Sequence, residues 1–110
     1  MTTITFTTSE DKYTSVECKG HAGFDEYGND IVCSAISILM INLVNSLEKF
    51  TDDKTELVEN EKKGLIRITF NDEPSHDASL LVKSFKLGVE TIFQEYGKDY
   101  LNIKFRREKS

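Results

Sequence analysis

Five stretches of the chain have the apolar and polar alternation, or the short apolar runs between turns, that is typical of β-strands. The five predicted strands are Thr2–Thr8, Tyr13–Lys19, Thr55–Val58, Leu65–Phe70 and Tyr100–Arg106. In the first strand Ile4 and Phe6 alternate with threonines, and in the second Val16 and Cys18 share one face. The third and fourth strands flank the polar turn Asn60–Gly64, which predicts a hairpin.

Two longer segments carry apolar residues at helical spacing. The first predicted helix covers Ile31–Phe50, with a buried stripe made of Val32, Ile36, Leu39, Leu43, Leu47 and Phe50. The second follows the N-cap Ser75 and stops at Gly97, with a stripe made of Ala78, Leu81, Phe85, Val89, Ile92 and Tyr96. Ile31, Ile38 and Ile41 lie off the first stripe, so we expect a partner subunit to cover a second face.

These elements predict an α+β fold with the order ββαββαβ. A chain of 110 residues is expected to form one domain, residues 1–110. Two hairpins and two amphipathic helices give a two-layer domain, with both helices on one face of a mostly antiparallel sheet. Gly20–Asp30 has no periodicity and contains three glycines, which predicts a long, mobile loop before the first helix.

Composition narrows the range of partners. The chain has 19 acidic and 14 basic side chains and a formal net charge of −5, which argues against direct binding to nucleic acid or to an anionic membrane. Polar residues interrupt Ile31–Phe50, so we expect a helix of a soluble domain and not a membrane span. Met1–Ser9 has no signal-peptide pattern, and the chain has only two cysteines. Both observations predict a cytoplasmic protein with reduced thiols.

The loop and the start of the first helix hold the candidate chemistry. Asp30 is a good N-cap, which would place Cys33 in the first helical turn, where free backbone N–H groups and the helix dipole stabilise a thiolate. An ordinary thiol is only about 3 % ionised at pH 7, and a helix end contributes typically about 0.3–1 kcal/mol. A charged His21, brought close to Cys33 by the loop, would supply the further stabilisation that the thiolate needs. A Cys–His pair is the minimal apparatus for nucleophilic catalysis.

The residues alone leave two other interpretations open. Cys33 could be a packed core residue of a non-catalytic, homodimeric binding module, which the family resemblance given below would make ribosome-associated. Cys18, His21, Cys33 and His76 could form a zinc site, although the spacing offers no second tight ligand pair. We expect Cys18 to lie in the core, because it shares a strand face with Val16, and we expect His76 to be solvated.

The motif Gly20-His21-Ala22, followed by Gly28-x-Asp30-Ile31-Val32-Cys33 and then Ser37, resembles the signature of the ribosomal-processing cysteine protease Prp family. The likeness extends over the whole chain in length and order of elements. It implies a cytoplasmic, homodimeric cysteine protease without cofactor or metal. Its substrate would be the precursor of a large-subunit ribosomal protein, from which it removes the N-terminal extension after a hydrophobic, aromatic-rich stretch.

The resemblance also implies roles for single residues. Cys33 matches the nucleophile and His21 the general base and acid, with Asp30 and Ser37 in supporting positions. Backbone N–H groups at the start of the helix, including that of Cys33, would receive the oxyanion. The residues expected to form the substrate-binding loop are Gly20, Ala22, Phe24, Tyr27 and Gly28. Asp25 and Ser34 depart from the usual pattern, and neither departure removes a reacting group.

Overall fold

A computed structural model describes residues 1–20, 27–97 and 99–108, and for residues 27–30 it describes the backbone only. The elements, in order, are β1 (Thr2–Ser9), β2 (Lys12–Gly20), α1 (Tyr27–Phe50), β3 (Thr55–Asn60), the 3₁₀ turn η1 (Glu61–Lys63), β4 (Leu65–Phe70), α2 (His76–Tyr96) and β5 (Leu101–Glu108). The predicted order of strands and helices, ββαββαβ, is confirmed. Strand bounds differ from the predicted ones by no more than two residues at either end, as expected for boundaries read from sequence.

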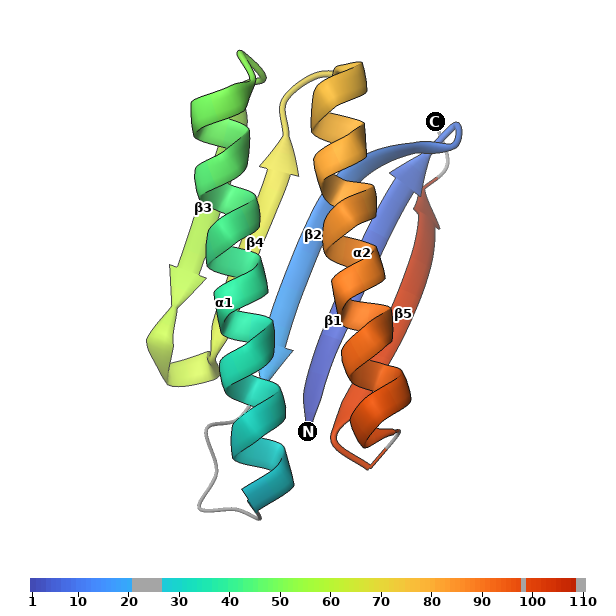
Figure 1. Ribbon diagram of the computed structural model, residues 1–110. Helices are drawn as coiled ribbons and strands as arrows, with labels where there is room; N and C mark the ends of the chain where they lie inside the picture. The colour runs from blue at the N-terminus through green and yellow to red at the C-terminus, as the bar shows by residue number, and fades with distance from the viewer. Residues whose placement is uncertain (21–26, 98, 109–110) are drawn as a thin grey trace.

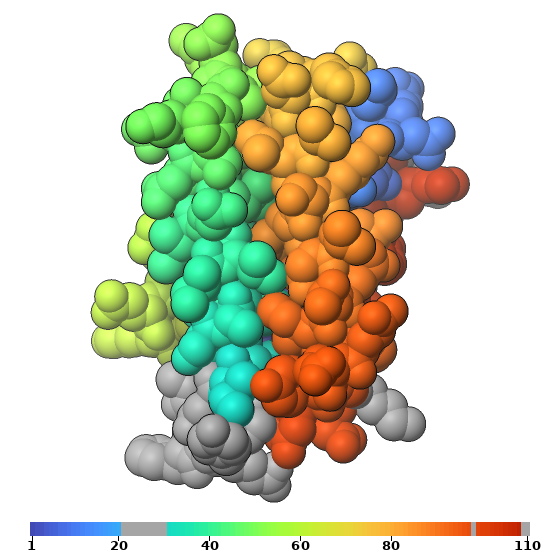
Figure 2. Space-filling view, viewed as in Figure 1, coloured from blue at the N-terminus to red at the C-terminus, as the bar shows by residue number. Residues whose placement is uncertain are grey.

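The five strands form one sheet in the order β3-β4-β2-β1-β5. Neighbouring strands are antiparallel except β1 and β5, which pair in parallel. The two described helices, α1 and α2, lie side by side on one face of this sheet (Figure 1), and their outer surfaces together form one face of the molecule (Figure 2). α1 starts at the end of the molecule where β2 finishes, whereas α2 starts at the opposite end.

The core fills the layer between the sheet and the helices. Its members with 0 % exposure are Ile4, Phe6, Val16, Val32, Ile36, Met40, Ala78, Val82 and Val89. Phe6 lies at the centre of an aromatic group: its ring stacks on Phe105 at 5.6 Å and meets Phe85 edge-on at 5.9 Å. These contacts join β1, β5 and α2, and α1 packs mainly against α2.

The predicted stripe of α1 is mostly correct. Val32, Ile36, Leu43 and Leu47 are all buried. The prediction was wrong for Phe50, which is the last residue of the helix and is 65 % exposed. Residues three and four apart share a helix face. Met40, four residues after Ile36 and three before Leu43, therefore occupies the buried position that the predicted stripe omitted.

The hydrophobicity of α1 requires a correction to the membrane argument. Ile31–Phe50, 20 residues, is long and apolar enough to cross a membrane by length and composition, so its polar side chains alone do not exclude a span. The helix packs on the sheet and on α2 and buries its apolar stripe there. The core helix of a soluble protein has the same length and composition, so this feature is weak evidence for a span.

The predicted loop Gly20–Asp30 is shorter than expected at both ends. Gly20 is the last residue of β2, paired with Thr2 of β1, and α1 begins at Tyr27 instead of Ile31. A glycine inside a helix costs only about 1 kcal/mol relative to alanine. A helix of 24 residues packed along its length tolerates Gly28, so the glycine does not mark the end of the loop. Residues 21–26 lie outside the described part of the chain.

A hydrogen-bonded cap ties the start of α2 to the segment that follows α1. Asp53 accepts hydrogen bonds from the backbone N–H of Ser75 at 2.8 Å and from its hydroxyl at 2.6 Å. The Ser75 oxygen in turn accepts from the N–H of Ala78 at 3.1 Å, which confirms Ser75 as the N-cap. Burial works against the charged form of Asp53, but the hydrogen bonds from Ser75 and Thr51 outweigh it and lower the pKa of this carboxyl.

We expect Asp53→Asn to lower the free energy of unfolding at pH 7 by about 0.5–1 kcal/mol, because the cap is largely exposed and loses a charged acceptor. A lowered native pKa stabilises the fold above the unfolded value of about 3.9, and this stabilisation is lost as pH falls through the native pKa. The variant should therefore show a smaller loss of stability between pH 7 and pH 3 than the wild type. Urea unfolding at both pH values measures the difference.

Asp52→Asn is the matched control, because Asp52 is exposed and adjacent in sequence. It should unfold like the wild type at both pH values. If Asp53→Asn and Asp52→Asn had the same urea midpoints, the capping role of Asp53 would be wrong.

Candidate active site

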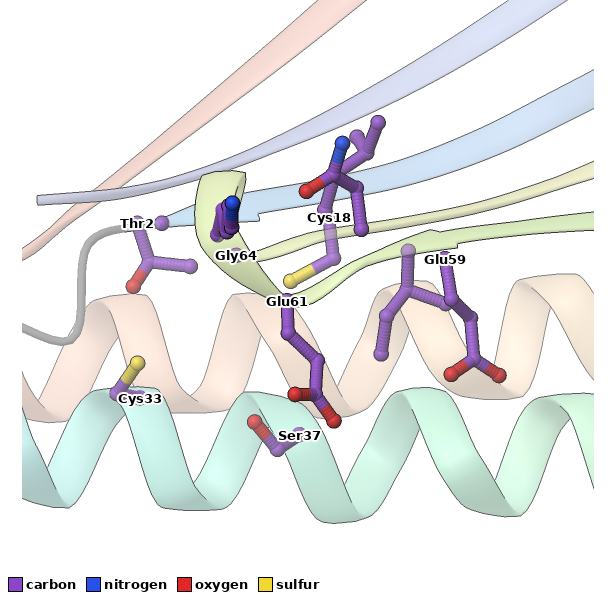
Figure 3. A pocket seen from close by; sticks show the side chains of 12 residues that line it. Thr2, Cys18, Cys33, Ser37, Glu59, Glu61 and Gly64 are labelled. Carbon is purple, nitrogen blue, oxygen red and sulfur yellow. The ribbon is translucent and has the colours of Figure 1, made fainter.

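One pocket of about 500 Å³ opens between the end of β2, the first half of α1 and the connection between β3 and β4 (Figure 3). Its lining residues are Thr2, Cys18, Gly20, Cys33, Ser37, Glu59, Asn60, Glu61, Lys62, Gly64, Leu65 and Ile66. Three residues predicted for the site, Gly20, Cys33 and Ser37, therefore meet in one cavity. They come from two elements that the sequence separates by the segment 21–26.

Cys33 lies deeper in its helix than predicted. Because α1 begins at Tyr27, Cys33 is its seventh residue and lies in the second turn, and Asp30 is inside the helix instead of capping it. Only the first four N–H groups of a helix lack an intrahelical partner. The N–H of Cys33 is therefore committed to the helix ladder, and the prediction that it receives the oxyanion is wrong for this helix. The dipole acts mainly within the first turn, so its effect on Cys33 is also smaller than expected.

The side chain of Cys33 faces the pocket. It is partly exposed and is not a member of the buried core, so the interpretation of Cys33 as a packed core residue is wrong. Its sulfur points from α1 toward the sheet (Figure 3). Ser37 follows one turn later on the same side of α1, as the spacing of four residues requires. A reagent or substrate in the pocket can therefore reach this thiol.

Cys18 is the second thiol of the pocket and differs sharply from Cys33. It is 8 % exposed and belongs to the core, as predicted. Burial, and to a smaller extent the nearby Cys33 and Glu17, raise the pKa of Cys18 to about 12. Cys18 therefore stays protonated at neutral pH, and since the thiolate is the nucleophile, Cys18 is a poor candidate for catalysis.

His76 lies too far from Cys33 to be one of the four ligands of the zinc site that the sequence left open. His76 is exposed, as predicted, and it is the first residue of α2, at the end of the molecule opposite to the start of α1 where Cys33 lies (Figure 1). Within residues 1–20, 27–97 and 99–108, no group of three His, Cys, Asp or Glu side chains could hold a metal ion. Cys33 and His76 thus cannot share a metal.

Several predicted site residues cannot be placed. His21, Ala22 and Phe24 lie outside the described residues. Tyr27, Gly28 and Asp30 belong to the first turns of α1, for which the structure gives the backbone alone. Their proposed roles therefore stay predictions.

The connection between β3 and β4 forms a pocket wall that contains none of the predicted site residues. Glu59, Glu61 and Gly64 line the pocket opposite α1, and the carboxylate of Glu61 points toward Ser37 (Figure 3). In the sequence this segment is an ordinary polar turn, and only the pairing of β4 with β2 brings it beside the pocket. Thr2, at the start of β1, lies beside the pocket because β1 pairs with β2, which no local pattern in the sequence predicts.

Gly64 and Gly20 make a close backbone contact at the edge of the pocket. Gly64 has φ of 60°, and its carbonyl oxygen accepts a hydrogen bond from the N–H of Gly20 at 3.1 Å. A Cβ placed on Gly64 would lie 1.8 Å from the carbonyl oxygen of Gly20. Because Gly20 immediately precedes His21, this contact fixes where the predicted active-site segment leaves the sheet.

We expect Gly64→Ala to lower the free energy of unfolding by more than the roughly 1–2 kcal/mol that a left-handed conformation alone costs. The added methyl group must also displace Gly20, so the proteolytic activity that the family resemblance implies should fall in the folded fraction. Urea unfolding and initial cleavage rates, corrected for folded protein, measure the two effects.

Gly97→Ala is the control, since Gly97 has φ of 76° but an added Cβ meets nothing within 4 Å. That variant should lose stability and keep the wild-type rate per folded molecule. If Gly64→Ala did the same, Gly64 would have no part in placing the site.

The fold and the pocket define a class of protein. A small α+β domain holds a partly exposed thiol on the face of a helix, in a cavity large enough for a peptide segment. No resident metal is implied by the side chains of the described residues. An enzyme with a cysteine nucleophile needs such an accessible thiol, and the base that would activate it is predicted at His21.

Comparison with known proteins narrows the class to a family. The family model of cysteine protease Prp matches residues 1–102. The ribosomal processing cysteine protease Prp of Staphylococcus aureus (strain Mu50) is 30 % identical over 106 residues, which cover 94 % of this chain and 100 % of that protein. The chain belongs to the Prp family of cysteine proteases, and it is a cysteine protease.

Solved structures share the fold. SMU.848 from Streptococcus mutans superimposes with a TM-score of 0.86 at 33 % identity, covering 98 % of this chain and 96 % of that one. The essential ribosomal processing protease Prp from S. aureus, in complex with a covalently linked product peptide, has a TM-score of 0.85 at 27 % identity, covering 96 % of this chain and 100 % of that one. The predicted α+β architecture is thus that of the family.

Proposed function

We propose that this protein removes the N-terminal extension from the precursor of a large-subunit ribosomal protein and so acts in ribosome maturation. The observation that carries the proposal is the partly exposed Cys33 thiol in a pocket of about 500 Å³ on a Prp fold. The S. aureus relative is described as a ribosomal processing protease with a covalently linked product peptide. Covalent attachment of a product is what a cysteine nucleophile would produce.

In the proposed mechanism the Cys33 thiolate attacks the carbonyl carbon of the scissile peptide bond. His21 takes the thiol proton and then gives it to the leaving amine. Water, activated by the same imidazole, releases the acyl group from the sulfur. Asp30 orients His21, and Ser37, one turn after Cys33 on the same wall of the pocket, supports the thiol side. No cofactor takes part in these steps.

The negative charge of the pocket wall and of the whole chain favours a basic substrate. Two acidic residues, Glu59 and Glu61, and one basic residue, Lys62, line the pocket wall across from α1, and the whole chain has a net charge of −5. Ribosomal proteins must neutralise RNA phosphates and are therefore rich in lysine and arginine. Electrostatic attraction would raise the rate of encounter with such a precursor and would weaken as salt increases. Phe24 and Tyr27 are proposed to contact aromatic side chains of the extension.

We also propose that the enzyme is a homodimer and works in the cytoplasm. The outer surfaces of the two helices carry exposed apolar side chains, Ile38 (68 %), Ile41 (53 %), Leu80 (56 %) and Leu87 (66 %). A second copy of the chain would bury them, and a domain of this size gains stability from such burial. Both cysteines are free thiols, in keeping with a reducing compartment. Sedimentation velocity at micromolar concentration tests the dimer.

The test of function is to incubate the purified protein with an extended ribosomal-protein precursor and read the new N-terminus by mass spectrometry. We expect one cut immediately after a hydrophobic, aromatic-rich stretch, and no cut in the same protein supplied without its extension. An intact precursor after prolonged incubation with an excess of folded enzyme would contradict the proposed substrate.

A further inference from the structure

The hydroxyl group of Thr2 is buried beside the pocket without a hydrogen-bond partner. Thr2 is 1 % exposed, and among the residues that the structure describes its Oγ1 is the buried side-chain oxygen that no donor or acceptor reaches. Its backbone is well fixed: the N–H of Thr2 donates to the carbonyl of Tyr100 at 3.0 Å, and Thr2 pairs with Gly20 across the sheet. A fixed hydroxyl thus has its full hydrogen-bonding capacity uncommitted.

This hydroxyl faces the candidate nucleophile. Thr2 and Cys33 line the same cavity, Thr2 from the sheet and Cys33 from α1. Figure 3 shows the Thr2 oxygen directed toward α1 and the Cys33 sulfur directed toward the sheet. Gly20 leaves room for this arrangement, because a Cβ at that position would lie 2.8 Å from Thr2 Oγ1. The two groups therefore approach one space from opposite sides.

One donor that was expected in the site, the N–H of Cys33, is committed elsewhere. Attack on a carbonyl by sulfur places negative charge on the carbonyl oxygen, and cysteine and serine hydrolases stabilise it with positioned hydrogen-bond donors. The N–H of Cys33 is committed to its helix, since α1 begins six residues earlier, at Tyr27. Thr2 supplies an unpaired O–H donor on the other side of the same cavity.

We propose that the Thr2 hydroxyl donates a hydrogen bond to the carbonyl oxygen of the peptide bond that Cys33 attacks; this inference rests on the proposed function. The sulfur electron pair forms the new bond to carbon, and the C=O π pair moves onto oxygen. The Thr2 proton stays on Oγ1 and gains its acceptor as that charge develops. The partner that the free structure does not provide is thus the substrate itself.

Thr2→Val tests this assignment, because valine keeps the shape of threonine and removes only the hydroxyl. Loss of one such donor typically lowers kcat by about 10²–10³-fold, so we expect a fall of about 100-fold with a smaller change in KM. Because the buried hydroxyl is unpaired, its removal deprives no other group of a hydrogen bond, and the urea midpoint should be unchanged or higher. Thr2→Ser should recover at least a tenth of the wild-type kcat.

Two controls separate this role from a structural one. Thr7→Val changes another buried threonine of β1, which points to the sheet face away from the helices, and it should cleave like the wild type. The rate at which iodoacetamide alkylates Cys33 should be the same in Thr2→Val and the wild type, because the hydroxyl acts on the carbonyl and not on the thiol.

Each other outcome overturns the assignment. Wild-type kcat in Thr2→Val would show that the hydroxyl makes no contact in the transition state. Slower alkylation in parallel with slower cleavage would place its effect on the Cys33 thiol. A loss of kcat matched by a lower urea midpoint would make Thr2 a purely structural residue. If the wild type cleaved no precursor at all, the proposed function would be wrong, and the proposed role of Thr2, which depends on it, would be wrong as well.

Discussion

Replacing Cys33 with alanine is expected to abolish precursor cleavage and leave the fold intact. Alanine removes the sulfur, which is the enzyme atom that forms the covalent bond to the substrate in the proposed mechanism. The residual rate of cleavage should therefore equal the rate without enzyme. Cys33 is partly exposed and lies outside the core, so its truncation should change the free energy of unfolding by less than about 0.5 kcal/mol. Mass spectrometry of the precursor and urea unfolding measure these two quantities.

The matched control is Cys18→Ala, in the other thiol of the same pocket. Cys18 is buried, so we expect this variant to lose roughly 1 kcal/mol of stability and to keep most of its turnover. Cys33→Ala is thus expected to change activity and not stability, whereas Cys18→Ala is expected to change stability and not activity. Cleavage by purified Cys33→Ala, or its loss in a folded Cys18→Ala, would show that the wrong cysteine has been identified.

Replacing His21 with alanine is expected to have the second largest effect, a loss of cleavage by at least 10²-fold. General acid–base catalysis by a positioned side chain contributes typically about 10²–10⁴-fold. Without the imidazole that takes its proton in the proposed mechanism, the Cys33 thiol should also be a poorer nucleophile. Alkylation of Cys33 by iodoacetamide near neutral pH should therefore become slower, which is measured by intact-mass analysis over time.

His76→Ala controls for the loss of a histidine, because His76 is exposed at the far end of the molecule. It should behave like the wild type in both assays. An unchanged alkylation profile in His21→Ala would mean that the thiol is activated by other groups, and unchanged cleavage would remove His21 from the mechanism.

The sequence was informative wherever one face of an element is buried. Burial imposes a period of two on strands and 3.6 on helices, so the sequence predicts Ile4 and Phe6 of β1 as inward-facing residues. Capping preferences predict Ser75 and Gly97 at the two ends of α2. Cys33 and Ser37, which were predicted for one site, both line the pocket, and residues four apart share a helix face.

Other features depend on long-range contacts that leave no periodic signal. The start of α1 was misplaced by four residues because Gly28 has the appearance of a loop residue, although a packed helix tolerates it. The pairing of β4 with β2 brings Gly64 onto Gly20, and the pairing of β1 with β2 brings Thr2 into the pocket. Strand order is a property of the whole fold, and no local pattern in the sequence encodes it.

The most direct measurement for the central assignment is site-resolved labelling with an electrophilic peptide. A chloromethyl ketone that carries the residues preceding the cleavage site would be added to the native enzyme, and the adduct located by fragmentation mass spectrometry. We predict one adduct per chain, on Cys33, with Cys18 unmodified because burial raises its pKa to about 12. An adduct on Cys18, or none on Cys33 in an enzyme that still cleaves its precursor, would contradict the account.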